Sequence, residues 1–132
     1  MQISKKAQYG LRAMLYLARK QKDKKVVPLK EIAKKERVPF AFLEKIMIQL
    51  EKAKLVKAKK GIQGGYFLAK RADKITPGDI VLVLEENITL VHCIGCPMAG
   101  KCTSEDVWDE VQQSLDTTLN GITLAELIGK SK

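Results

Sequence analysis

The sequence has one histidine, three cysteines and few aromatic residues, which make up 5% of its 132 positions. A single histidine leaves no Ser-His-Asp set for nucleophilic catalysis, and no Gly-x4-Gly-Lys-Ser/Thr loop is present to cradle a nucleotide phosphate. No apolar run approaches the length of a membrane span, and the N-terminal residues lack a signal-peptide pattern. These absences argue against an enzyme and against a membrane protein, and we expect a cytoplasmic location.

Acidic residues are scarce in the first part of the chain. Residues 1–74 contain 21 Lys or Arg and six Asp or Glu, a net charge of +15, whereas residues 75–132 contain three and nine, a net charge of −6. The chain as a whole carries +9 and has a pI near 9.5. Because the positive charge is concentrated in one part, we expect that part to bind a polyanion.

Residues 28–68 have the pattern of a winged helix-turn-helix. A short amphipathic helix ends before Pro39, because a residue that precedes proline is biased away from helical geometry. A second helix begins near Phe40, and its buried stripe is predicted from helical spacing to be Leu43, Ile46, Met47 and Leu50. Two β-prone runs, 55–59 and 66–70, then flank the wing glycines Gly61, Gly64 and Gly65.

The second helix of such a unit enters the major groove of double-stranded DNA. Its face opposite the stripe carries Ala41, Glu44, Lys45, Ile48 and Lys52. Glu44 can accept a hydrogen bond from cytosine N4, and Lys45 can reach guanine or a phosphate. Taken alone, this face is more simply interpreted as a solvated helix surface. The hairpin that follows favours DNA binding.

The hairpin itself carries lysines at its tip, namely Lys57, Lys59 and Lys60. A basic wing lies along phosphates or in the minor groove. The simpler interpretation is an ordinary hairpin with solvent-exposed lysines.

The flanking segments are predicted to be helical. Ser4 can cap a helix that runs to about Lys20, and Thr76 can cap one that opens with Pro77. The run 80–84 is too uniformly apolar for an exposed helix, so we expect it to be buried, with an interface between subunits as one possible setting.

A long helix, capped by Thr103 or Ser104, is predicted to run to about Leu119. Its narrow apolar stripe consists of Val107, Trp108, Val111, Leu115, Leu119 and Ile122. Such a stripe suits a helix–helix contact, either in a homodimer or against the chain's own domain. We favour the homodimer because a protein that reads two DNA half-sites needs one.

The predicted fold class is therefore mainly α with a small β-hairpin, a winged helix-turn-helix followed by a long C-terminal dimerisation helix. We divide the chain into a DNA-binding domain over residues 1–74 and a region over residues 75–132 that contains a cysteine loop and the dimerisation helix.

All three cysteines, Cys93, Cys96 and Cys102, lie within ten residues in the pattern C-x2-C-x5-C. Structural disulfides are rare in the cytosol, and clustered thiolates point to an iron–sulfur cluster or to zinc. The spacing alone does not separate these two, and a redox-active thiol pair is a third interpretation. A fourth ligand could come from His92, Glu105 or Asp106, or from elsewhere in the dimer.

Over essentially its full length, the chain resembles the winged-helix regulators that include IscR, NsrR and CymR. The matching segments are 1–10, 39–46, 60–68, the cysteine loop and 119–128. The resemblance implies a homodimeric transcription regulator. In many members of this family, three cysteines hold a 2Fe–2S or 4Fe–4S cluster that senses iron–sulfur status, nitric oxide or redox state.

By this resemblance, Glu44 takes the position of a glutamate tied to DNA sequence choice. Ala41, Phe42 and Lys45 fall on neighbouring contact positions, and Lys60 falls where an arginine commonly enters the minor groove.

The chain also departs from the family pattern. Its first cysteine gap is shorter than the one associated with IscR. Glu105 stands where IscR-like members have a histidine ligand, and Gln8 stands where some NsrR-like members have an acidic ligand. The fourth ligand and the cluster type therefore stay open.

The alternative is a cluster-free regulator that is controlled by thiol oxidation, by zinc or by a partner protein. A small electron-transfer protein is a third hypothesis, which the basic wing argues against.

Overall fold

The computed structural model describes residues 2–23, 25–86, 90 and 96–130. Within these ranges the chain is mainly helical and has one two-stranded antiparallel hairpin, so the predicted fold class is confirmed. The elements are α1 (Lys5–Lys20), η1 (Gln21–Asp23), α2 (Leu29–Glu36), α3 (Phe40–Lys52), β1 (Val56–Lys59), β2 (Gly65–Leu68), η2 (Ala72–Lys74), α4 (Pro77–Leu84), α5 (Glu105–Asn120) and α6 (Leu124–Gly129).

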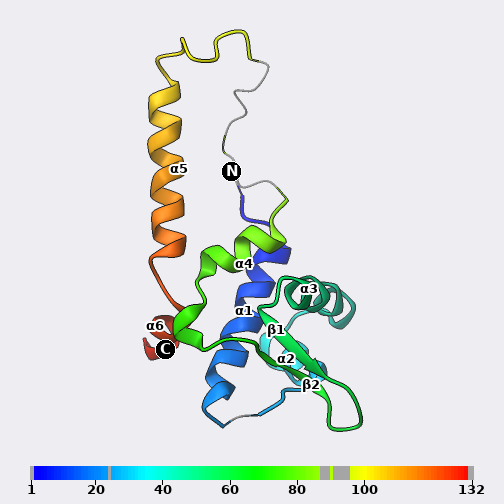
Figure 1. Ribbon diagram of the computed structural model, residues 1–132. Helices are drawn as coiled ribbons and strands as arrows, with labels where there is room; N and C mark the ends of the chain where they lie inside the picture. The colour runs from blue at the N-terminus through cyan, green and yellow to red at the C-terminus, as the bar shows by residue number, and fades with distance from the viewer. Residues whose placement is uncertain (1, 24, 87–89, 91–95, 131–132) are drawn as a thin grey trace.

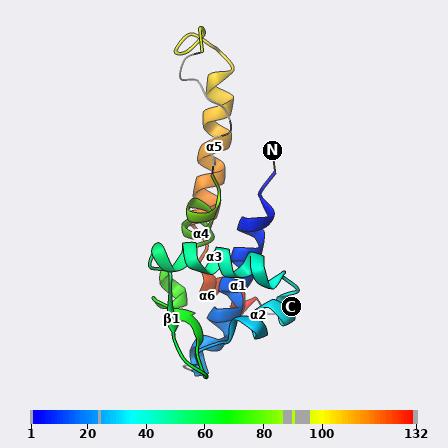
Figure 2. The same cartoon turned by 90° about the vertical axis from the view of Figure 1, so that its right-hand side faces the viewer.

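Helix α1 forms the centre of the molecule, with α2, α3, α4, α6 and the hairpin around it (Figures 1 and 2). Ser4 caps it as predicted, because its hydroxyl accepts a hydrogen bond of 3.1 Å from the Ala7 amide. Gly10 lets α1 approach α4 closely, since a Cβ at this position would overlap the Leu84 side chain and touch Ile46 of α3. Three helices therefore meet at one residue without a side chain.

Helices α2 and α3 form the predicted helix-turn-helix. Arg37 ends α2 in the left-handed conformation, with φ of 53°, and the Val38 side chain is buried at the turn. The predicted stripe of α3 is confirmed, because four of its side chains are completely buried: Leu43, Ile46, Met47 and Leu50. Their burial fixes which face of α3 points outward.

The hairpin is tied to the chain that precedes α2. Its strands are shorter than the predicted runs, and the Val56–Leu68 pair closes its base. Val27 forms an additional bridge, in which Val27 and Tyr66 exchange two backbone hydrogen bonds of 2.9 Å. Gly65 permits this bridge, since a Cβ at that position would overlap the Val27 carbonyl.

Helix α4 begins with the predicted cap. Thr76 and Asp79 form a reciprocal capping box, with hydrogen bonds of 3.2 and 2.9 Å. The expectation of a fully buried apolar run is only partly right, because Leu82 is 65% exposed and Val83 is half-buried. An α-helix has only one face toward α1 and α3, so Leu82 points away from that core.

The core is continuous across residue 74. Ile75, Ile80 and Leu84 belong to the same buried cluster as the helix-turn-helix. Helix α6 adds Leu124, which is completely buried, and the Leu124 amide donates a 2.9 Å hydrogen bond to the Ile75 carbonyl. The end of the chain thus packs on α1 (Figure 1).

Helix α5 differs from every other helix longer than two turns, because it has no buried residue. It packs against α4 near its C-terminal end, where Gly78 leaves room for Asn120. Both views show the rest of α5 projecting beyond the body (Figures 1 and 2). Across the described residues, no helix combines the length and apolar character needed to cross a bilayer.

Candidate DNA-binding surface and cysteine loop

The outward face of α3 carries the residues that were predicted to meet base edges. Ala41, Glu44 and Lys45 are exposed, and so are Ile48 and Lys52 further along the same face. The burial of the opposite stripe leaves these side chains no contact with the core. Their composition, with one acceptor and two cations, suits the major groove.

Phe42 is the exception among the predicted contact residues. It is half-buried, and its ring packs edge-on against Tyr9 of α1 with 5.6 Å between the ring centres. The Arg12 guanidinium lies over the Tyr9 ring, 5.7 Å from its centre, and Arg12 forms a 3.5 Å ion pair with Glu36 of α2. This cluster braces the start of α3 against α1 and α2.

The wing presents its basic residues to solvent. Lys57, Lys59 and Lys60 are all exposed, and Gly61 at the tip has a φ of +117° that favours glycine. Gly64 also faces the backbone of the tip, since a Cβ there would overlap the Lys59 carbonyl. The three wing glycines, Gly61, Gly64 and Gly65, therefore each have a structural reason.

The lysines of α3 and of the wing form no ion pair with a carboxylate among the described residues. Among the described residues, the ion pairs join Arg12 to Glu36 and Arg71 to Asp73, and neither uses a lysine of α3 or of the wing. Free ammonium groups on neighbouring protrusions are what a phosphate backbone requires.

Tyr66 lies on β2 of the wing, and charges on α3 influence its phenol. Burial raises the pKa of its phenol, and the negative charges of Glu51 and Glu44 on α3 raise it further. From the sequence, Tyr66 was predicted only as part of a β-prone run and of the wing segment 60–68. Its two backbone bonds to Val27 come from residues 39 positions apart and could only be found in the fold.

The second half of the cysteine loop lies at the end of α5 that is remote from the body (yellow in Figure 1). The Cys96 carbonyl accepts a 3.1 Å hydrogen bond from the Ala99 amide, and Gly100 has a φ of +79° in the same turn. Cys96 is exposed and Cys102 is half-buried. His92 and Cys93 lie outside the described residues, so the three-cysteine set cannot be placed as a whole.

Cys102 has a distinctive environment. Its Sγ lies 2.8 Å from the Ser104 hydroxyl, and this hydrogen bond, followed by backbone donors at Ser104 and Glu105, lowers the pKa of the thiol. Ser104 precedes α5 as predicted, but its hydroxyl contacts Cys102 and makes no capping bond. A thiol at the start of a helix with hydrogen-bond donors is suited to act as a thiolate.

Glu105, a candidate ligand from the sequence, accepts a 3.2 Å hydrogen bond from the Gly100 amide. In the described part of the chain, no three His, Cys, Asp or Glu side chains are grouped in metal-binding geometry. The donor set is nevertheless chemically suited to a soft metal, because two of its thiols lie in one short turn and one has a lowered pKa.

Two residues of the segment between α4 and α5 are hydrogen-bonded to other elements. Glu85, directly after α4, accepts a 3.0 Å hydrogen bond from the Ser4 amide at the start of α1. Gln112 of α5 accepts a 3.1 Å bond from the Leu90 amide. These two bonds connect the segment to the N-terminus of α1 and to the middle of α5.

Comparison with known proteins gives consistent matches. Residues 3–130 match the Rrf2 family, described as an iron-dependent transcriptional regulator. IscR of Yersinia pseudotuberculosis, an HTH-type transcriptional regulator, is 31% identical over 131 residues, which cover 97% of this chain and 79% of that protein.

Solved structures agree with these matches. The structure of CymR, the global cysteine regulator of B. subtilis, has a TM-score of 0.86 and 31% identity over 100% of this chain and 99% of that one. IscR of T. potens has a TM-score of 0.84 and 34% identity over 100% and 89%. These relatives are regulators of transcription, in agreement with a sequence that has no catalytic set.

Proposed function

Since this chain belongs to the Rrf2 family of transcriptional regulators, we propose that it binds operator DNA as a homodimer and senses iron–sulfur, redox or nitric oxide status through its cysteine loop. The proposal depends mainly on one observation: the basic surface and the cysteine-bearing turn lie at separate places in the fold. A basic, exposed reading surface lies on α3 and the wing, and a thiol-bearing turn lies at the far end of α5.

The DNA contacts follow from exposure and charge. Ala41, Glu44 and Lys45 would face base edges, while Lys60 would follow the wing into the minor groove. Phe42 would act chiefly by holding the start of α3 in place, because its ring is packed against Tyr9.

The homodimer is supported by the apolar stripe of α5. Trp108 is 43% exposed, Val107 49% and Leu115 37%, although all three belong to the predicted stripe. Packing against the chain's own body, the alternative considered from the sequence, is not what these exposures indicate. A second copy of α5 would cover the stripe by two-fold symmetry and would set the distance between the two α3 helices.

The sensor is assigned to Cys93, Cys96 and Cys102, with His92 or Glu105 as the fourth ligand. An iron–sulfur cluster bound there, 2Fe–2S or 4Fe–4S, would supply redox and nitric oxide chemistry. The chain's own contribution is to present thiolates, which the hydrogen bond from Ser104 favours at Cys102.

The signal would reach the DNA-binding surface through contacts already present. Glu85 holds the Ser4 amide, and Leu84 packs against Gly10, so a shift at the end of α4 displaces α1. Tyr9 on α1 then bears on Phe42 of α3. The steps are one hydrogen bond and two packed contacts, a contiguous series through which a displacement would be transmitted.

The DNA-binding part is tested with operators selected from random duplexes. Glu44→Ala should bind selected and scrambled sites more equally, because it loses a base contact. Lys60→Ala should weaken binding to both by a similar factor and reduce the slope of log affinity against log salt by about one. Lys130→Ala, an exposed lysine directly after α6 and away from α3 and the wing, is the control. Identical behaviour of Glu44→Ala and Lys60→Ala would contradict these roles.

The cluster is tested by absorption spectroscopy with iron and sulfide assays on protein purified without oxygen. Wild-type protein should show charge-transfer absorption with matched iron and sulfide, and Cys96→Ala should lose both. Wild-type protein that stays colourless after reconstitution, or a Cys96→Ala variant with an unchanged spectrum, would contradict the assignment.

A second candidate is a cluster-free regulator that responds to oxidation of its thiols. It is favoured by the Ser104–Cys102 hydrogen bond, which lowers the pKa of the Cys102 thiol. A lower pKa increases the fraction of thiolate, and the thiolate is the form that reacts with oxidants. Iron-free protein whose operator affinity changes on treatment with peroxide, and is restored by a thiol reductant, would support this candidate over the first.

A further inference from the structure

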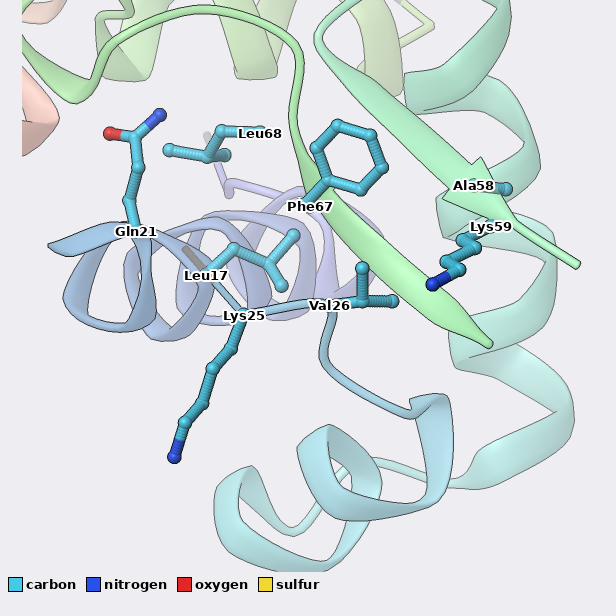
Figure 3. A pocket seen from close by; sticks show the side chains of 8 residues that line it. All are labelled: Leu17, Gln21, Lys25, Val26, Ala58, Lys59, Phe67 and Leu68. Carbon is cyan, nitrogen blue, oxygen red and sulfur yellow. The ribbon is translucent and has the colours of Figure 1, made fainter. Parts of the chain in front are cut away.

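A cavity of about 560 Å³ lies between the C-terminal end of α1 and the wing hairpin. Its walls are drawn in Figure 3 and come from three segments: residues within 17–26, which includes the end of α1, residues 58–59 of β1 and residues 67–68 of β2. The lining residues are Leu17, Gln21, Lys25, Val26, Ala58, Lys59, Phe67 and Leu68. This volume is within the usual range for small-molecule sites, roughly 300–1,000 Å³.

The walls of the cavity are fixed by hydrogen bonds. Gln21 donates to the Lys70 carbonyl at 2.8 Å and accepts from the Ala72 amide at 3.0 Å, which ties the end of α1 to the chain after β2. On the other side, the Val27–Tyr66 bridge holds the 25–26 segment against β2. The cavity is therefore formed without a ligand, so ordering it costs little on binding.

The lining combines an apolar interior with charge of one sign. Five of its eight residues are apolar, the two charged residues are Lys25 and Lys59, and no carboxylate is present. Figure 3 shows the apolar side chains of Leu17, Val26 and Leu68 around the cavity, with Lys25 extending away from them. Both ammonium groups are exposed and outside the ion pairs of the described residues.

From this combination we propose that the cavity binds a small amphipathic carboxylate, with its hydrocarbon body on Leu17, Phe67 and Leu68 and its anionic group at Lys59. Most of the affinity comes from the hydrocarbon body of the ligand, because its own apolar surface leaves water in the cavity. Leu17 and Leu68 are already buried, so the wall area that is newly covered belongs mainly to the half-buried Val26 and Phe67. The exposed lysine supplies selectivity for an anion over a neutral analogue. The site lies far from the cysteine loop and would be a separate input to the wing (Figure 1).

The test uses the full chain in the absence of DNA, with octanoate as the probe. Binding of octanoate is measured by methyl NMR and by calorimetry. Octanoate should bind saturably, once per chain, and should shift the methyl signals of Leu17 and Leu68 but not those of Leu127 on α6. Neutral octanol should bind about two- to fivefold more weakly, the range expected from one exposed charge pair.

Three variants locate the site. Ala58→Phe should fill the cavity and abolish the binding of octanoate. Lys59→Ala should lower the affinity for octanoate about two- to fivefold and leave the affinity for octanol unchanged. Lys57→Ala, a lysine on the same strand that does not line this cavity, should leave both affinities unchanged. Far-ultraviolet circular dichroism checks that each variant folds.

Three results would overturn the proposal. They are the absence of saturable octanoate binding to the wild-type chain, octanol binding as tightly as octanoate, and methyl shifts confined to residues outside the cavity. The last readout needs no variant, so it decides the matter even if Ala58→Phe does not fold.

Discussion

Helices α3 and α5 differ in whether their apolar stripes are buried within the chain. In residues 1–74 the stripe of α3 is completely buried and the surface is basic. In residues 75–132, the second part of the chain, the net charge is negative, and the longer apolar stripe of α5 has no buried member. The α3 stripe belongs to a core that α4 and α6 share, whereas α5 leaves apolar surface for another partner.

An amphipathic pattern predicts that one face of a helix is covered. It does not identify whether the same chain or a second chain covers that face. Leu50 of α3 and Leu115 of α5 both belong to predicted apolar stripes, yet Leu50 is completely buried and Leu115 is 37% exposed. The same hydrophobic driving force would act within the chain in one case and between chains in the other.

The largest expected effect comes from the core of the first part. Leu50→Ala should lower the free energy of unfolding by about 2–5 kcal/mol, because it leaves a cavity where packing is complete. Ile48→Ala, in the same helix but 47% exposed, should change it by less than about 0.5 kcal/mol. Urea denaturation measures both, and equal losses would remove the distinction between the two faces of α3.

The next effect concerns the second part. Trp108→Ala should raise the dimer dissociation constant by about 30-fold or more, as expected for a tryptophan at the centre of an interface. The isolated chain should keep its fold, because α5 buries no residue in it. Sedimentation velocity over a concentration series measures the change, with Asp109→Ala as the control. A variant that dimerises as the wild type does would contradict the role of the stripe.

A smaller effect is expected at high pH in the first part. Burial, and then the hydrogen bond and negative charge of Glu31, raise the pKa of Tyr16 from its ordinary value to about 12. The folded state holds the phenol proton of Tyr16 more tightly than the unfolded state does. The resulting contribution of Tyr16 to the free energy of unfolding is therefore complete below pH 10 and is lost as the pH rises toward 12.

The free energy of unfolding that Tyr16 contributes should fall by about 1–2 kcal/mol over this pH range. It is measured as the difference in unfolding free energy between the wild type and Tyr16→Phe at pH values from 8 to roughly 12. A difference that stays constant over this range would contradict the contribution of Tyr16.

The smallest effect is kinetic and lies in the second part. Ser104→Ala removes the first cause of the lowered pKa of Cys102, so the pKa should rise and less thiolate should be present at neutral pH. Alkylation of Cys102 by iodoacetamide in iron-free protein should slow a few-fold. Cys96 in the same protein is the internal control, followed by peptide mass spectrometry. An unchanged rate at Cys102 would show that Ser104 does not tune it.

Much of the first part could be predicted from its sequence because the signals are local. Helical spacing placed Leu43 and Leu50 inside, Pro39 marked the turn, and the wing glycines marked the hairpin tip. Contacts between distant segments carry no such signal. The Val27–Tyr66 bridge, the packing of Leu124 on the core and the cavity beside Phe67 all depend on how the elements assemble.

For the candidate site, the sequence was sufficient for residue types and exposure but not for local geometry. It gave Phe42 and Glu44 the same kind of role, whereas the structure packs Phe42 against Tyr9 and leaves Glu44 exposed. It also treated Ser104 as a helix cap, while the hydroxyl serves Cys102. Ring packing and a side-chain hydrogen bond depend on rotamers, which spacing does not specify.

The central claim is that the state of the cysteine loop changes how the other part of the chain binds DNA. The most direct test is the affinity for one selected operator, measured at a single salt concentration, for protein with its iron and for the same preparation after chelation. The two affinities should differ at least about fivefold, the lower end of usual allosteric coupling, and Cys96→Ala should show no difference. Equal affinities in the wild-type protein would contradict the claim.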